Sequence, residues 1–331
     1  MSVDIKTAAV EPIRKTFDHL KERLGDKQPS RYQEAVFDLQ PKVNFHYRPT
    51  WDPEREIYDV RRTAVKMEDF DQLLDPRQYY YGTYTIQRAK QQDSQEANFA
   101  FVEKRDLFDT IPQDWKDKLV KLVLPVRHIA WAANTNNSFI AAYGYGAPVT
   151  SAATFQMTDE LGNAQYITRI GLILGNNETT QLSLAKEFWL NDPLWQPMRR
   201  LVEDSMVVKD WFELHVLQNF LIDGGVYPLV FDRLDREIED HGGTAFSMLT
   251  EFTAAWFDEA KRWTDAVIKV AAQESAENQA TLNGWLASWS PRVREALQPL
   301  AEQALGDKAE AELDEIFAEL ASRAKKTGLS L

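Results

Sequence analysis

Hydrophobic residues recur every three or four positions through most of the chain after residue 112, a spacing that places them on one face of a helix. Phe252, Trp256, Trp263 and Val267 form one such stripe. Comparable stripes predict helices over 115–145 with a break at Pro125, 151–175, 181–190, 197–221 and 244–271. Strand-type alternation is almost absent. The pattern predicts an all-α fold, with four long helices in an up-down bundle and further helices packed outside it.

Glycines mark two further boundaries. Gly224-Gly225 follows the segment 197–221, and because glycine is unfavourable inside a helix, we expect that helix to end there. The residues after 280 predict two more helices, the second of which begins after Gly306.

The first third of the chain shows no sustained period. Prolines interrupt it repeatedly, and residues 37–58 mix prolines with aromatic side chains. Four tyrosines gather at 79–84, just before an amphipathic segment that predicts a helix to about Arg105. Such a segment is poorly suited to fold alone but can wrap a partner, and aromatic residues are enriched in interfaces. We predict an arm with a subunit interface centred on 37–88; ordinary packing is the alternative.

At about 150 residues per domain, 331 residues correspond to about two domains or to one large helical domain with appendages. The change of pattern predicts three parts. They are an N-terminal arm with short helices that contacts other subunits (1–112), a helical bundle core (113–275), and C-terminal helices packed on that core (276–331).

Composition narrows the possible functions. The chain has no cysteine, which excludes disulfides, thiolate metal sites and cysteine nucleophiles. A net charge of −13 argues against nucleic acid or an anionic membrane as partner. No apolar stretch is long enough to span a membrane, and the first residues carry acids and a proline where a signal peptide would be apolar. We expect a cytoplasmic protein.

Two polar motifs interrupt the apolar stripes. In one, Asp159-Glu160 is followed by Asn163 on the same helical face; in the other, Asp258-Glu259 is followed by Arg262. One motif lies in each half of the bundle. Di-iron carboxylate bundles have this layout, with a Glu-x-x-His on each of two helices and a single Glu on each of two others.

The metal ligands of such a centre are missing from this sequence. None of the five histidines follows a glutamate at the third position. Between Asp117 and Asp159 there is no acid, so the helix that should supply a lone glutamate offers only amides and His128. On the helix over 197–221, Glu213 is a possible remnant. We predict that no metal binds here and that Glu160, Asn163, Glu259, Arg262 and possibly Glu213 are vestigial ligand-like positions.

A metal-free polar network is the interpretation we favour. Glu259 would pair with Arg262 one turn on, because a lone buried carboxylate is costly, and Glu160 and Asn163 would lie opposite. The alternative is that both motifs are ordinary surface contacts between residues three apart on a helix.

With these motifs, the chain resembles the hydroxylase components of bacterial multicomponent monooxygenases, and it resembles their β subunit in the loss of the ligands. The N-terminal segments YRPT at 47–50, WDP at 51–53 and DPR at 75–77 are similar to the β-chain pattern of the phenol hydroxylase branch. The resemblance implies a ferritin-like fold, related to that of ribonucleotide reductase small chains, over nearly the whole chain. It leaves the toluene, alkene and methane branches open.

The resemblance also implies partners and cofactors. This chain would be a non-catalytic structural subunit of an α2β2γ2 hydroxylase that acts on phenol with O2, with the di-iron centre in the α subunit. NADH, FAD and a 2Fe-2S cluster would belong to a separate reductase, and a regulatory protein would bind transiently. Two alternatives stay open: a stand-alone ferritin-like oxidase that uses Glu160, Glu213 and Glu259 as metal ligands, and an unrelated helical scaffold.

Overall fold

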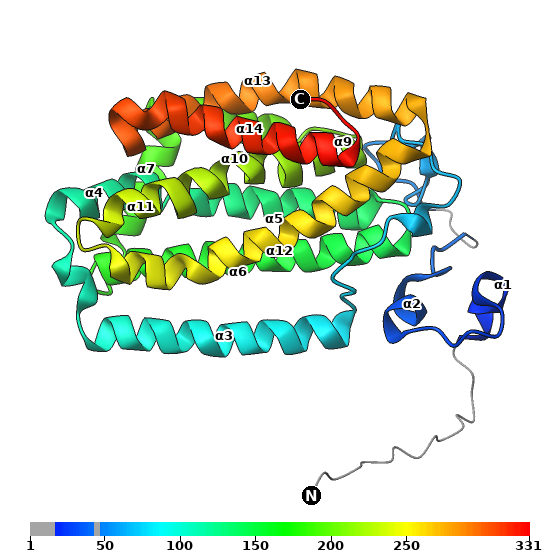
Figure 1. Cartoon of the computed structure of the whole chain (residues 1–331), viewed down its shortest axis with the longest axis horizontal. Coiled ribbons are helices and arrows are strands. Elements are labelled where there is room, and N and C mark those ends of the chain that lie inside the picture. The colour runs from blue at the N-terminus through cyan, green and yellow to red at the C-terminus, as the bar shows by residue number, and fades with distance from the viewer. Residues whose placement is uncertain (1–16, 43–46) are drawn as a thin grey trace, which may run out of the picture.

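The computed structural model describes residues 17–42 and 47–331, and all regular structure in this part of the chain is helical, as predicted. Long helices lie side by side along the longest axis of the molecule (Figure 1). The α-helices are α1 (Lys21–Leu24), α2 (Arg31–Val36), α3 (Tyr81–Lys104), α4 (Gln113–Leu122), α5 (Val126–Tyr143), α6 (Ala147–Leu174), α7 (Thr180–Asn191), α8 (Gln196–Ser205), α9 (Trp211–His215), α10 (Asp223–Pro228), α11 (Leu234–Glu239), α12 (Thr244–Glu274), α13 (Ala276–Leu305) and α14 (Ala309–Thr327). Shorter 3-10 or π-helical pieces are η1 (Asp18–Leu20), η2 (Val60–Arg62), η3 (Phe70–Gln72), η4 (Leu107–Thr110), η5 (Val216–Ile222), η6 (Leu229–Arg233) and η7 (Gly306–Lys308).

Most predicted boundaries agree with the structure. The break at Pro125 separates α4 from α5, because proline has no backbone N–H to continue the helix. The predicted helix after Gly306 is α14, which follows the short turn η7. The amphipathic segment predicted to reach about Arg105 is α3, and it ends one residue earlier.

The helix predicted over 197–221 begins as expected, at Gln196, but it is interrupted after Ser205 and its predicted end is wrong. Helix α8 stops at Ser205, and a new helical run begins at Trp211 and continues through Gly224-Gly225 to Glu239. The glycines do not end it, because they are buried where neighbouring helices approach closely. A β-carbon at Gly225 would lie 2.5 Å from the Leu297 Cδ1 atom, and one at Gly224 would lie 2.6 Å from a Leu320 methyl carbon.

One hydrophobic core extends from Val65 to Leu329 and includes side chains of α12, α13 and α14. A smaller cluster joins α2 to the segment before α1 and includes Leu20 and Tyr32. None of the helices in residues 17–42 and 47–331 combines the length and the apolar character that a bilayer crossing requires.

The described part of the predicted arm lies against the bundle of its own chain. The Lys66 backbone N–H donates to Asn278 Oδ1 at 2.9 Å, and the Trp51 indole packs edge-on against Tyr143 with ring centroids 5.1 Å apart. Tyr84 is buried, whereas Tyr81 is 78% exposed. Part of the aromatic surplus therefore serves internal packing. Residues 1–16 and 43–46 of the arm lie outside the described residues.

Candidate functional site

The two carboxylates of the first motif face different partners. Asp159 and Glu160 are neighbours on α6 and are both buried, with exposed fractions of 9% and 0%. Asp159 accepts hydrogen bonds from Trp256 Nε1 at 3.0 Å and from Tyr84 Oη at 2.9 Å. Glu160 accepts one from Tyr227 Oη at 2.8 Å. Two separate groups of hydrogen-bonded polar side chains therefore lie at this level of the bundle. We call the group around Asp159 the outer cluster and the group around Glu160 the inner chain.

Arg88 of α3 is the centre of the outer cluster. Its Nε and Nη2 atoms donate to both oxygens of Asp159 at 2.8 and 2.7 Å, and Nη2 also donates to Glu259 Oε1 at 2.8 Å. Burial of Glu259 raises its pKa, but the hydrogen bond and positive charge of Arg88 outweigh this effect and leave the pKa below its usual value. One arginine thus forms ion pairs with a carboxylate from each motif.

A second arginine lies beside this pair. Arg77 is buried and bonded to Asp75 through Nε at 2.9 Å, and its Nη1 atom is 3.6 Å from Glu259 Oε1. The prediction that Glu259 pairs with Arg262 is wrong. Arg262 is exposed, and Glu259 points instead toward α3 and the segment that precedes it.

The inner chain of hydrogen bonds crosses the bundle between α5 and α6. Asn136 Nδ2 donates to Gln218 Oε1 at 2.8 Å, and Gln218 Nε2 donates to Asp223 Oδ1 at 2.7 Å. The carboxyl groups of Asp223 and Glu160 are buried next to one another, and neither Asp223 Oδ2 nor Glu160 Oε1 has a hydrogen-bond donor from another residue in the described part of the chain. On the far side of Glu160, Tyr227 Oη donates to this carboxyl, and Asn163 Nδ2 lies 3.5 Å from the same hydroxyl oxygen.

The contact between Asp223 and Glu160 favours a proton. Two ionised carboxylates at adjacent positions repel one another, and both groups are buried. Burial raises the pKa of Glu160 well above its usual value, and the negative charge of Asp223 adds to the effect. Burial also raises the pKa of Asp223. Burial and the mutual repulsion of the two carboxylates therefore favour the protonated form of this pair.

The helix that should carry a lone glutamate ligand carries amides instead. Asn137 of α5 and Asn219 of η5 exchange two hydrogen bonds of 3.0 Å. His215 lies beside them, with its Nδ1 atom 2.9 Å from Asn219 Nδ2 and its ring 4.8 Å from that of Trp263. Burial lowers the pKa of His215 to about 3, so the imidazole is neutral. These groups join helices without adding charge.

Glu213 lies apart from both groups in its hydrogen bonding. It accepts a bond from Trp289 Nε1 at 2.8 Å, and partial burial raises its pKa. Of the five ligand-like positions, Glu160 and Asn163 belong to the inner chain, Glu259 belongs to the outer cluster, and Arg262 and Glu213 bond to neither.

The donor set does not fit a di-iron centre. Two iron ions need several carboxylates and imidazoles directed at one point. Within residues 17–42 and 47–331, no three His, Asp or Glu side chains are grouped so that they could hold a metal ion. Arg88 also directs a positive charge at Asp159 and Glu259, the carboxylates that would otherwise attract a cation.

Arg88, Asp223 and Tyr227 were not among the residues predicted from the sequence. Arg88 is one of many charged residues on α3, and its role depends on a contact across 171 positions. Asp223 did give a signal. It follows the apolar run of η5, where Gln218 also interrupts the hydrophobic residues, and a charged residue at such a place needs a partner.

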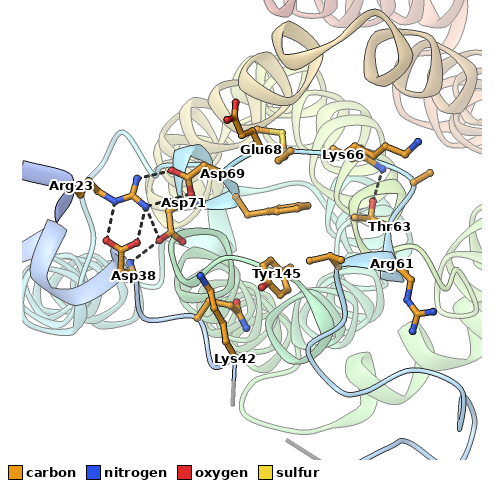
Figure 2. A pocket seen from close by; sticks show the side chains of 16 residues that line it. Arg23, Asp38, Lys42, Arg61, Thr63, Lys66, Glu68, Asp69, Asp71 and Tyr145 are labelled. Atoms are coloured by element: carbon orange, nitrogen blue, oxygen red, sulfur yellow. Dashed lines mark hydrogen bonds and ion pairs between the residues drawn. The ribbon is translucent and has the colours of Figure 1, made fainter. Parts of the chain in front are cut away.

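A cavity of about 620 Å³ lies elsewhere, between the arm and the end of the bundle near Tyr145. Figure 2 shows Arg23 at one end of it and Arg61 at the other. Arg23 pairs with Asp38 at 2.8 Å and with Asp69 at 2.6 Å. No vestigial position lines this cavity.

Known proteins share both the sequence and the shape of this chain. A phenol 2-monooxygenase oxygenase component, DmpL, of Pseudomonas sp. (strain CF600) is 46% identical over 99% of this chain and 98% of its own length. The hydroxylase component subunit beta of the toluene-4-monooxygenase system of Ectopseudomonas mendocina is 23% identical over 87% of this chain and 89% of its own. A crystal structure of xenon-pressurized phenol hydroxylase from Pseudomonas sp. OX1 superposes with a TM-score of 0.93 at 45% identity and covers 99% of both chains.

This likeness confirms the predicted ferritin-like fold. The family model described as methane/phenol/alkene hydroxylase matches residues 51–275, which include both carboxylate motifs, Arg88 and the whole inner chain of hydrogen bonds. The chain belongs to the methane/phenol/alkene hydroxylase family.

Proposed function

We propose that this chain is the non-catalytic β subunit of a phenol hydroxylase, an oxidoreductase that acts only as a complex. The 46% identity to a phenol 2-monooxygenase oxygenase component over nearly the whole chain supports the phenol branch over the toluene, alkene and methane branches. The observation that carries the non-catalytic role is the arginine-bridged pair formed by Asp159, Arg88 and Glu259 at the place of metal ligands.

The di-iron centre belongs, in this proposal, to the partner α subunit, and it supplies the activation of O2. The assembly is α2β2γ2 and works with a transient regulatory protein. A separate reductase with FAD and a 2Fe-2S cluster passes electrons from NADH. Because NADH is an intracellular reductant, we place the complex in the cytoplasm.

Within this complex, the role of the present chain is structural. The bundle core at 113–275 and the C-terminal helices at 276–331 supply a rigid body, and the arm at 1–112 contacts other subunits around 37–88. The exposed side chains of Tyr81 and Trp51, at 78% and 42%, support the arm as a contact region.

Metal counting on the co-purified complex tests the proposal. The chain is expressed together with α and γ subunits of a phenol hydroxylase, and iron is measured per subunit. We expect two irons per α subunit and phenol hydroxylation once the reductase and the regulatory protein are added. The Glu160→Gln variant should retain the iron content, because this carboxyl binds a proton and not a metal.

A different result would favour the stand-alone oxidase. In that case the chain purified without partners would hold stoichiometric iron, and Glu160→Gln and Glu259→Gln would each lose it. Product analysis with phenol and toluene as competing substrates separates the branches, and a preference for toluene would contradict the phenol assignment.

A further inference from the structure

Four buried oxygen atoms at the inner chain lack a hydrogen-bond donor. They are Gln156 Oε1, Glu160 Oε1 and Asn163 Oδ1 on α6 and Asp223 Oδ2 at the start of α10, and none of them accepts a bond from the described part of the chain. The four residues are 2% exposed or less, so bulk solvent does not reach them. We call these four atoms the oxygen row. Because a buried acceptor without a donor destabilises a fold, nearly all such atoms in native proteins have a partner.

Helix geometry places three of these oxygens on one side of α6. Gln156, Glu160 and Asn163 follow one another at intervals of four and three residues, so their side chains leave the helix on the same face. The Tyr227 hydroxyl connects two of them. It donates to Glu160 Oε2 at 2.8 Å, and Asn163 Nδ2 lies 3.5 Å from its oxygen. The amide of Asn163 and the carboxyl of Glu160 therefore lie beside the same hydroxyl group.

The wide turn of η5 brings Asp223 to the same place. Hydrogen bonds in a π-helix join residues five positions apart, and the side chains of Gln218 and Asp223 have this spacing. Gln218 Nε2 donates to Asp223 Oδ1 at 2.7 Å, which occupies one oxygen of the carboxyl and leaves Oδ2 without a donor. The Glu160 carboxyl is its neighbour, and the charge of Asp223 raises the pKa of Glu160. The oxygen row thus consists of two carboxyl and two amide oxygens.

The occupant of the oxygen row must donate hydrogen bonds, because all four atoms are acceptors. A proton on the carboxyl pair supplies one donor, and the neighbouring carboxyl can accept its bond. The amide oxygens of Gln156 and Asn163 still need donors of their own.

A water molecule meets this need better than a metal ion does. Water donates as well as accepts hydrogen bonds, and internal waters in proteins typically make about three bonds to buried polar groups. A Ca²⁺ ion takes about six to eight oxygen ligands, which is more than the row offers. Across residues 17–42 and 47–331, no three His, Asp or Glu side chains are grouped for a metal.

We propose that the inner chain binds internal water at the oxygen row, with at least one molecule held between Glu160 Oε1 and an amide oxygen of Gln156 or Asn163. The water supplies the donors that these side chains lack, and it allows them to stay buried in a bundle without a metal centre. The inference is independent of the proposed function, since it concerns only groups inside this chain.

A crystal structure that shows ordered water, of the full-length chain or of its complex, tests the proposal. In the wild type we expect a density peak within about 3.2 Å of Glu160 Oε1 and of one amide oxygen of the row. Gln156→Met and Asn163→Leu each remove one of these amide oxygens and keep a side chain of similar size. The variant that removes the amide partner of the water should lose the peak. The control Gln165→Met makes the first change at an exposed position of α6 and should keep it.

Three results would overturn the inference. The first is a wild-type structure without a peak at the oxygen row. The second is a row in which the amide nitrogens of Gln156 and Asn163 donate directly to the carboxyl pair, so that no water is needed. The third is a peak with the anomalous signal of a metal ion. The wild-type density decides alone if neither variant folds, and the proposed function, which iron content of the complex tests, is unaffected by the first two results.

Discussion

Arg88 Nη2 donates to Glu259 Oε1 at 2.8 Å, and this ion pair connects the helix that follows the arm to the second carboxylate motif. The same guanidinium holds Asp159 of the first motif at 2.7 Å. The side chain of Arg88 is 13% exposed and that of Asp159 is 5% exposed, so solvent screens the charges little. A single positive charge from α3 thus joins the two motif helices.

Removal of Arg88 should destabilise the fold strongly. In Arg88→Leu, Asp159 and Glu259 lose their shared cation while staying largely buried, and breaking a buried ion pair from one side costs about 3 kcal/mol or more. Urea unfolding of the full-length chain, followed by tryptophan fluorescence, measures the change.

The matched control is Arg262→Leu, which removes an exposed arginine near Glu259 in the sequence. We expect a change within about 0.5 kcal/mol. An equal decrease in the free energy of unfolding for the two variants would contradict the assignment of Arg88 as the partner of Glu259.

Glu160 should make stability depend on pH. Its pKa is raised in the fold, mainly by burial, above the value of about 4.3 that it has in the unfolded chain. Its contribution to stability is therefore complete below about pH 4.3 and is lost as the pH rises toward the folded pKa. Between pH 5 and 7, wild-type stability should fall relative to Glu160→Gln by up to about 1.4 kcal/mol per pH unit.

Unfolding at pH 5, 6 and 7 checks this slope. Glu251→Gln serves as the control, because Glu251 is an exposed carboxylate on α12. The free energy of unfolding of this control should change with pH in the same way as that of the wild type. If the free energy of unfolding of Glu160→Gln also changed with pH in the same way as that of the wild type, Glu160 would be ionised in the folded protein.

Removal of the Tyr227 hydroxyl should deprive the Glu160 carboxyl of a hydrogen-bond donor. In Tyr227→Phe, the Oε2 atom of this buried carboxyl has no replacement partner, and an unsatisfied buried polar group costs about 1–3 kcal/mol. Tyr47→Phe, at a tyrosine that is 59% exposed, should change stability by less than about 0.5 kcal/mol. Thermal unfolding of both variants separates the two expectations.

Two helical glycines should respond to alanine in opposite directions. At Gly225 the new β-carbon would lie 2.5 Å from Leu297 Cδ1, inside the core, and overpacking of this kind costs about 1–3 kcal/mol. At Gly284 nothing lies within 4 Å, so alanine should gain about 0.5–1 kcal/mol of helix propensity. Equilibrium unfolding of Gly225→Ala and Gly284→Ala measures both, and stabilisation by Gly225→Ala would show that the helix contact is looser than described.

Much of the fold was predictable because the signals are local. The spacing of apolar residues and the position of Pro125 predict helices whose stripes must face a common core. The Gly224-Gly225 segment was mispredicted for an equally physical reason. Glycine is a poor helix former in isolation, but at these two positions the close approach of α13 and α14 outweighs the local preference.

The sequence by itself determined that the fold is all-α, that two carboxylate motifs lie on its apolar stripes, and that the histidines of a di-iron centre are absent. Each of these depends on residue type and spacing along one segment. Tertiary structure alone decided the partners, because Arg88 reaches Glu259 and Asp223 reaches Glu160 across long stretches of chain. The spacing along the helix pointed to Arg262 as the ion-pair partner of Glu259. Arg262 is exposed, however, and a buried charge is stabilised most by a partner that is shielded from water with it. Arg88, which comes from another helix, is such a partner.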